Sequence, residues 1–173
     1  MAEQKSLGAL YTLWIAVVVF IVDQATKLWS EAVLKVEGTV IEVVPFFNLR
    51  LAYNKGAAFS FLADAGGWQK WFFALIALGV SVMLIFWLKK LQSNQKLLML
   101  AYNLILAGAL GNLFDRLAYG HVIDFLDFYY GTYHWPAFNI ADVGICVGAG
   151  LLILDVLISD SSSTEGEVKH GNS

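Results

Sequence analysis

The stretch FNIADVGICVGAGLLILDVL, residues 138–157, is apolar enough to cross a lipid bilayer, yet it carries Asn139 and Asp142. An acid at the centre of a membrane helix costs about 2.5–3.5 kcal/mol on insertion scales. An ionisable residue inside a membrane segment is therefore a functional-site hypothesis by default. Asp142 lies about a turn and a half into the apolar run, which predicts a position close to one membrane surface.

Three further apolar runs of membrane-spanning length occur in this chain of 173 residues. The four runs cover approximately residues 7–29, 71–88, 97–114 and 137–158. Only 14% of the residues are charged, whereas a soluble domain usually carries about 25%. The fold class we expect is an all-α polytopic membrane protein with four transmembrane helices, in which both termini lie on the same side.

The loop KKLQSNQK between the second and third runs indicates the orientation. It contains three lysines, and the positive-inside rule places such a loop in the cytoplasm. Both termini would then be cytoplasmic, and the segments 30–69 and 115–136 would lie outside the cytoplasm. We expect residues 1–158 to form a single membrane-embedded domain, and the polar residues 159–173 to form a disordered cytoplasmic tail.

The first outer segment is predicted to contain a small extracytoplasmic β-element. In FNLRLAYN, residues 47–54, apolar and polar side chains alternate with the period of a strand. NKG at 54–56 then predicts a turn, and AAFSFLADAGG at 57–67 predicts a short interfacial helix. Elsewhere, small residues at helical spacing predict close contacts between helices; they are the pairs Ala107/Gly111 and Gly144/Gly148.

Polar side chains gather in the second outer segment and its flanks. They comprise four acids and three other polar residues: Asp115, Asp124, Asp127, Asp142, Asn112, Arg116 and Asn139. Asp124 lies on a stretch that must return to the membrane surface where Asp142 is expected. Two carboxyl groups that meet in a poorly solvated site cannot both ionise, so the pair holds one proton near neutral pH. Such a pair can hydrolyse a peptide bond by general acid–base catalysis, without a metal.

Several of these residues have other interpretations. A metal site would use histidines such as His121 and His134, but we predict no metal and no cofactor. A nucleophilic Cys146 would lack a histidine within a membrane span. Asp127 is interpreted as a solvated surface acid.

Asp23 and Lys27, near the end of the first run, are four positions apart and therefore share a helix face. They are interpreted first as a self-neutralising helix pair, or with Lys27 extending to the membrane interface.

Other functional classes also remain open at this point. A small proton-coupled transporter would use intramembrane acids as a relay, and a lipid-binding scaffold would not use their chemistry at all. The acids gather at one surface and no inverted repeat is evident, which argues against the transporter. No basic cluster indicates a nucleic-acid partner.

Five motifs together resemble the lipoprotein signal peptidases, also called signal peptidase II. They are DQATK (23–27), FNLRLAYNKGAAFSFL (47–62), GALGNLFDRL (108–117), GHVIDFLDF (120–128) and FNIADVGI (138–145). The resemblance covers nearly the whole chain.

The resemblance implies an aspartic endopeptidase of the bacterial inner membrane. Such enzymes remove signal peptides from diacylglyceryl-modified prolipoproteins, cutting just before the lipidated cysteine at the outer leaflet. Membrane lipids and globomycin-type inhibitors are the other partners that it implies. By motif, the catalytic pair is Asp124 and Asp142. The supporting or substrate-binding residues would be Asp23, Lys27, Asn54, Gly56, Asn112, Asp115, Arg116 and Asn139.

Within such a site, each supporting residue has an expected role. We expect Arg116 to order the loops through Asp115 or through backbone carbonyls. Asn54 and Asn139 are expected to orient the substrate or the catalytic carboxylates.

Overall fold

The computed structural model describes the backbone of residues 8–56 and 66–170, and side chains as far as residue 158. The described helices are the 3-10 helix η1 (Gly8–Thr12) and the α-helices α1 (Leu13–Leu34), α2 (Gln69–Leu88), α3 (Lys96–Ala118) and α4 (Ile140–His170). Four stretches in them are long and apolar enough to cross a membrane: Gly8–Leu34, Gln69–Leu88, Lys96–Ala118 and Ile140–Ile158. The prediction of four membrane-spanning helices is confirmed at this level.

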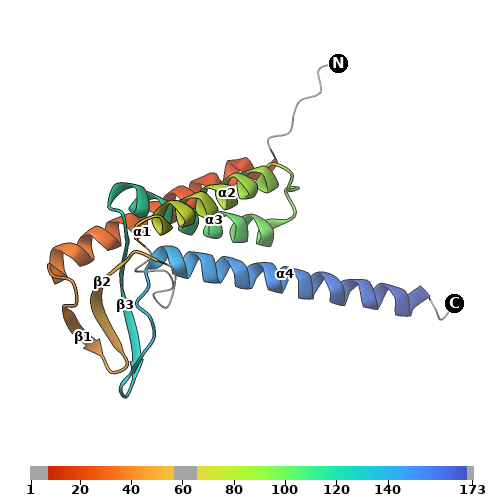
Figure 1. Ribbon diagram of the computed structural model, residues 1–173. Coiled ribbons are helices and arrows are strands. Elements are labelled where there is room, and N and C mark those ends of the chain that lie inside the picture. The colour runs from red at the N-terminus through yellow and green to blue at the C-terminus, as the bar shows by residue number, and fades with distance from the viewer. Residues whose placement is uncertain (1–7, 57–65, 171–173) are drawn as a thin grey trace.

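An antiparallel sheet lies at one end of the helical bundle (Figure 1). Its strands β1 (Val40–Val44), β2 (Phe47–Asn54), β3 (Val122–Tyr130) and β4 (Tyr133–His134) are neighbours in that order. The fold is therefore not all-α, which corrects the predicted class. Strand β3 escaped prediction because its residues 122–125 are buried on both faces, so its sequence VIDFLDFYY lacks the alternation of a half-exposed strand.

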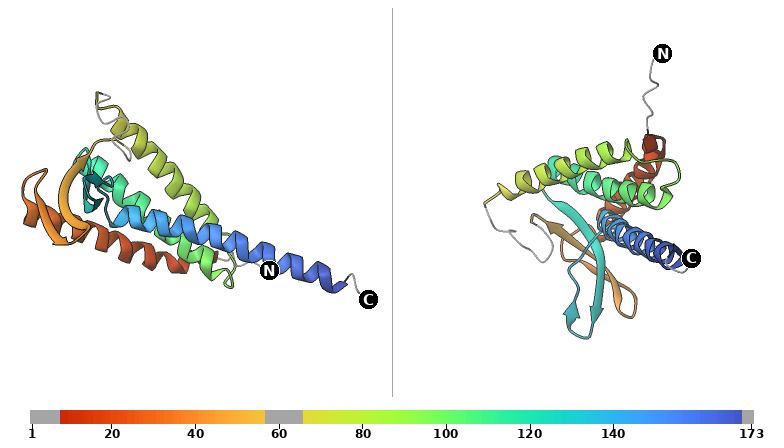
Figure 2. Two further views of the ribbon diagram at one scale, coloured as in Figure 1. Left: turned by 90° about the horizontal axis from the view of Figure 1, so that it is seen from below. Right: turned by 90° about the vertical axis from the view of Figure 1, so that its right-hand side faces the viewer.

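Helix α3 is the centre of the bundle, in contact with α1, α2 and α4 (Figure 2). Half of its most apolar stretch is buried, against about a fifth in each of the other three spans. Small residues allow these close approaches. A Cβ atom at Gly111 would collide with the carboxylate of Asp23, and one at Gly148 would lie 2.8 Å from the carbonyl oxygen of Ala101. The predicted close helix contacts at these glycines are confirmed.

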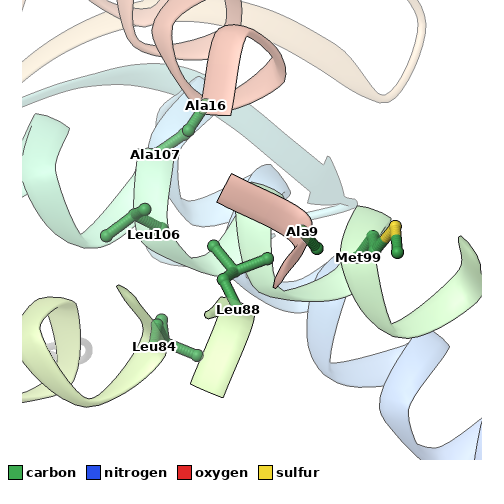
Figure 3. Close-up of a cluster of buried hydrophobic side chains, with 7 residues drawn as sticks. All are labelled: Ala9, Ala16, Leu84, Leu88, Met99, Leu106 and Ala107. Atoms are coloured by element: carbon green, nitrogen blue, oxygen red, sulfur yellow. The ribbon is translucent and has the colours of Figure 1, made fainter. Parts of the chain in front are cut away.

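The two ends of the bundle have different cores. Far from the sheet, buried apolar side chains of η1, α1, α2 and α3 pack together (Figure 3): Ala9, Ala16, Leu84, Leu88, Met99, Leu106 and Ala107. Near the sheet, a smaller cluster joins the end of α1 to β2 and β3: Leu34, Leu51, Ile123 and Phe125. This second cluster fixes the sheet against the helices.

Two segments, 57–67 and 159–170, were predicted as an interfacial helix and as part of a disordered tail. The short interfacial helix predicted at 57–67 falls mainly on residues 57–65, which lie outside the described residues. Helix α4 continues to His170, so the backbone of residues 159–170 is helical where the sequence predicted a disordered tail. An established helix extends readily, because each added residue gains one hydrogen bond without a new nucleation step.

Candidate active site

The N-terminus of helix α4 holds Asp142 through a local motif. The side-chain oxygen of Asn139 accepts a hydrogen bond from the backbone N–H of Asp142 (3.0 Å), and the Asp142 carboxylate accepts one from the backbone N–H of Asn139 (3.3 Å). This reciprocal arrangement is a capping box, with Asn139 as the capping residue. The helix begins at Ile140, so Asp142 lies in its first turn, closer to the helix end than the sequence predicted.

Asp124 reaches the same place from strand β3. The register of the sheet pairs Asp124 with Ala52 of β2, and its side chain is only 2% exposed. One carboxylate oxygen accepts a hydrogen bond from Asn139 Nδ2 (2.7 Å), and the other accepts one from Asn54 Nδ2 (3.2 Å). Both asparagines thus orient a carboxylate, which is one of the two roles expected for them.

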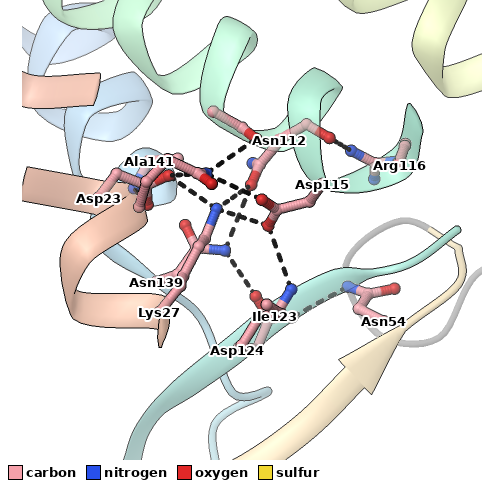
Figure 4. A network of polar contacts seen from close by, with 12 residues as sticks. Asp23, Lys27, Asn54, Asn112, Asp115, Arg116, Ile123, Asp124, Asn139 and Ala141 are labelled. Atoms are coloured by element: carbon pink, nitrogen blue, oxygen red, sulfur yellow. Dashed lines mark hydrogen bonds and ion pairs between the residues drawn. The ribbon is translucent and has the colours of Figure 1, made fainter. Parts of the chain in front are cut away.

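Asn112 completes the connection between the two acids. Its Nδ2 donates to Asp142 (2.8 Å), and its Oδ1 accepts a hydrogen bond from Asn139 Nδ2 (3.3 Å), the amide that also binds Asp124. Two amide side chains therefore join the acids, as Figure 4 shows in part. Asp124 and Asp142 line the same cavity, of about 470 Å³.

The surroundings of Asp124 favour its protonated form. Burial removes water from the carboxyl group and raises the pKa of Asp124 to about 7, and the negative charge of Asp142 acts in the same direction. The hydrogen bonds from Asn139 and Asn54 oppose this shift. A carboxyl group with this pKa can supply or hold a proton near neutral pH.

Lys27 lies behind the two acids in a buried ionic network. Its Nζ is 2.8 Å from the carboxylates of both Asp23 and Asp115, and it donates to Asn112 Oδ1 (3.2 Å). The helix pair of Asp23 and Lys27 is therefore present, but Lys27 is fully buried and does not extend to the membrane interface. Because Lys27 binds Asn112, the network fixes the amide that contacts Asp142.

The same network secures two other elements, α4 and β3, and the side chain of Gln24 on α1. Asp23 accepts the backbone N–H of Ala141 (2.8 Å), which leaves one less unpaired donor in the first turn of α4. Asp115 accepts the backbone N–H of Ile123 (3.3 Å) on β3 and the side-chain amide of Gln24 (2.8 Å). Gln24 was not among the residues predicted for the site, although it lies between Asp23 and Lys27 in the DQATK motif.

Arg116 connects helix α3 to the turn after strand β2. Its guanidinium donates to the backbone carbonyls of Asn112 (3.1 Å) and Gly56 (3.0 Å). The N–H of Gly56 in turn donates to the side chain of Asn54 (3.0 Å), as in an Asx turn. Of the two partners expected for Arg116, the structure has backbone carbonyls, whereas Asp115 pairs with Lys27.

The structure gives the surroundings of three further residues near the site, namely Asp127, His134 and His121. Asp127 is fully buried, so its interpretation as a surface acid is wrong. His134 binds Asp127 through Nδ1, and His121 packs its ring against Tyr53 at 4.2 Å. Both histidines thus take part in contacts away from Asp124 and Asp142.

The cavity is mainly apolar around its polar group of residues. Its wall comes from the segment before α4 and from the first turns of α4: Trp135, Pro136, Ala137, Phe138, Val143, Ile145, Cys146 and Val147. Such a site can bind an apolar ligand and present it to a few convergent polar groups. The fold and the site together define a class, namely polytopic membrane proteins with a pair of acids in an apolar cavity at one end of the bundle.

Comparison with known proteins narrows this class. Residues 15–158 match the family model described as signal peptidase (SPase) II. The chain is 54% identical over 155 residues to the lipoprotein signal peptidase of Aeromonas hydrophila subsp. hydrophila, covering 90% of this chain and 92% of the relative. It is 52% identical over 158 residues to that of Shewanella loihica, covering 91% and 92% respectively.

Solved structures agree with the sequence comparison. A bacterial membrane enzyme at 33% identity superposes with a TM-score of 0.78, covering 92% of this chain and 96% of that enzyme. The chain belongs to the signal peptidase II family. Membership of a peptidase family favours hydrolysis over the proton-coupled transporter that the sequence left as an alternative.

Proposed function

We propose that the protein is an aspartic endopeptidase that removes signal peptides from diacylglyceryl-modified prolipoproteins, cutting just before the lipidated cysteine. The observation that carries the proposal is the meeting of Asp124 and Asp142 in one cavity, where Asn112 and Asn139 join them. Family membership supports a prolipoprotein substrate. The apolar cavity wall suits a lipid-modified peptide.

The proposed reaction uses the two carboxyl groups and one water molecule. Asp142 lies in the first turn of α4, where the helix N-terminus stabilises a negative charge, and we assign it the role of the base. It takes a proton from the water as the oxygen attacks the scissile carbonyl carbon. Asp124, whose pKa is raised to about 7, gives its proton to the carbonyl oxygen.

The second half of the reaction breaks the peptide bond. Asp142 returns the proton taken from water to the amide nitrogen, and the C–N bond of the tetrahedral diol breaks. Asp124 regains its proton from a hydroxyl of the diol as the new carboxyl group forms. The signal peptide leaves with that carboxyl group, and the lipidated cysteine becomes the new N-terminus.

The proposed orientation is supported by the arrangement of charge along the bundle. The lysine-rich loop between α2 and α3 lies at the end of the bundle away from the sheet and the acids (Figure 1). With that loop in the cytoplasm, both termini are cytoplasmic and the acids face outward from the bacterial inner membrane. A lipidated cysteine at the outer leaflet would then lie at the depth of the cavity. The same apolar cavity would accept globomycin-type inhibitors, and membrane lipids would surround the helices.

The proposal is tested with purified full-length protein in detergent micelles. A diacylglyceryl-modified precursor and the same precursor without the modification are incubated with it, and the released signal peptide is measured. We expect cleavage of the modified precursor and little or none of the unmodified one. Equal rates on both would remove the lipid requirement, and no cleavage of either would overturn the proposed function. The variants Asp124→Asn and Asp142→Asn are the inactive controls.

A further inference from the structure

A second polar cluster joins strands β2, β3 and β4 outside the lining of the cavity. Asp127 on β3 is 0% exposed. One of its carboxylate oxygens accepts a hydrogen bond from Asn48 Nδ2 (3.1 Å), and both oxygens lie within 3.0 Å of His134 Nδ1. His134 is about 40% exposed, so the cluster lies at the edge of the sheet with its acid pointing inward.

The groups around Asp127 are arranged for an ionised carboxylate. A carboxylate only accepts hydrogen bonds, so Nδ1 of His134 carries a hydrogen whether the ring is neutral or charged. Asn48 directs its NH2 group at Asp127, although its Oδ1 has no hydrogen-bond partner among the described residues. A buried acceptor without a partner costs free energy. The hydrogen bond from Asn48 to Asp127 therefore contributes more than this cost. The His134 ring also stacks on Tyr129 at 5.4 Å.

The chain passes directly from His134 into one wall of the cavity. Residues 135–138 all line the cavity, and we call them the 135–138 wall. The near end of this wall is attached to β3 by the His134 side chain and by the N–H of Trp135, which donates to the carbonyl of Phe128 (2.7 Å). Together with this backbone bond and the pairing of β4 with β3, a side-chain cluster that does not itself line the cavity therefore holds the near end.

The far end of the wall has its own attachment. The carbonyl of Phe138 accepts hydrogen bonds from the N–H groups of Phe125 (3.0 Å) and Leu126 (2.9 Å), and its N–H donates to Leu126 (3.1 Å). The Phe138 ring stacks on Phe128 at 5.9 Å. Asn139, which holds Asp124, follows Phe138 directly. Loss of the near attachment would therefore move the wall while the acids keep their places.

We propose that Asp127 and His134 form a clamp that positions the 135–138 wall, and that this wall binds the apolar part of the substrate beside the scissile bond. This inference rests on the proposed peptidase function. Asp127 and His134 are positioning residues, because they do not line the cavity. Since the far end of the wall is held separately, the clamp controls substrate binding more than the chemical step.

The test separates the hydrogen bond of His134 from its ring. His134→Phe keeps a ring that can stack on Tyr129 but lacks the Nδ1 donor. His134→Asn keeps a donor close to the position of Nδ1 but lacks the ring. Tyr133→Phe is the matched control, because Tyr133 is its neighbour and is 82% exposed. Initial rates are measured against the surface concentration of diacylglyceryl-modified precursor in detergent micelles, and thermal unfolding is followed for each protein.

We expect His134→Phe to raise KM about five- to tenfold with kcat changed less than about twofold, because uniform binding is lost and the acids remain in place. The KM of His134→Asn should lie within about twofold of the wild-type KM. The KM of Tyr133→Phe should equal the wild-type KM. An unchanged KM in His134→Phe would overturn the clamp. So would a lower kcat at unchanged KM, which reports a smaller folded fraction.

Asp127→Asn gives a second route if His134→Phe does not fold. It keeps an acceptor oxygen but removes the charge, so KM should rise about two- to fivefold with kcat retained, and an unchanged KM overturns the clamp. The two proposals fail differently. Absence of cleavage by the wild type overturns the proposed function, and the clamp with it. Wild-type cleavage with unchanged KM in the variants overturns the clamp alone.

Discussion

The two ends of the helical bundle are built on opposite principles. The end away from the sheet buries Leu84, Leu88 and Met99 against small residues, at 3% exposure or less. The end next to the sheet buries five ionisable side chains at 2% exposure or less: Asp23, Lys27, Asp115, Asp124 and Asp127. Buried charges are costly unless they are paired, whereas apolar packing needs no partner of opposite charge. The apolar end therefore supplies stability, whereas the polar end holds the ionisable groups of the site at a cost in folding free energy.

The largest effect should come from removing Lys27, the fully buried cation of the polar end. Lys27→Met leaves Asp23 and Asp115 buried without their shared partner, which costs about 3–5 kcal/mol of unfolding free energy. It also releases Asn112, so we expect cleavage to fall about 100-fold or more in the folded protein. Precursor cleavage and thermal unfolding measure both effects. Lys96→Met, which changes an exposed lysine at the apolar end, is the matched control; an equal loss in both variants would contradict the comparison.

A smaller effect is expected from pH. Since the pKa of Asp124 is raised from 3.8 to about 7, the folded protein retains a proton that an unfolded chain would lose. Cleavage should therefore fall about tenfold per pH unit above about 7, as Asp124 loses its proton. The contribution of this group to folding also declines as pH rises from about 4 to about 7, because the native state binds more protons than the unfolded state there. A pH–rate profile of kcat measures the first effect, and a rate still rising at pH 9 would contradict it.

The smallest effect on activity is expected at the apolar end. Leu88→Ala opens a cavity in the packed cluster and should lower the unfolding free energy by about 2–4 kcal/mol. Cleavage per folded molecule should stay within about twofold of the wild type, because the site is held by its own network. Leu75→Ala, at a residue 68% exposed on the bundle surface, serves as the control for stability. A large loss of specific activity in Leu88→Ala would show that the two ends are not independent.

The sequence predicted the helices better than the sheet. The spans could be recognised because a bilayer demands a continuous apolar run, and no other feature gives one of that length. Strand β3 is buried on both faces over residues 122–125, so it shows no period of two there, and β1 is exposed at all five positions. Because β3 was not predicted, the burial of Asp127 was not predicted either. Its burial depends on β4, which follows β3 directly, and on β2, whose Asn48 lies 79 residues earlier in the chain.

The site was predictable in part. The spacing of Asn139 and Asp142 at the start of an apolar helix is a capping signature, and it brings the second acid to a helix N-terminus. The meeting of Asp142 with Asp124 depends on the return of β3 across the bundle end. The resemblance of the motifs indicated Asp124 and Asp142 as a pair, and the fold then brought the two residues to one cavity. The link through Asn112 and the burial of Lys27 between two acids required the three-dimensional arrangement of α1 and α3.

The central claim is that Asp124 and Asp142 interact in a poorly solvated cavity and hold one proton near neutral pH. Infrared difference spectroscopy of the carboxyl stretch, recorded across pH for the folded protein, measures this directly. The wild type should show a carboxyl group that titrates at about pH 7 and is absent from Asp124→Asn. In Asp142→Asn the midpoint should fall, yet remain above 3.8, because burial is the first cause of the shift and the charge of Asp142 the second. A wild-type protein with no carboxyl group titrating above about pH 5, close to the ordinary range of Asp, would contradict the account.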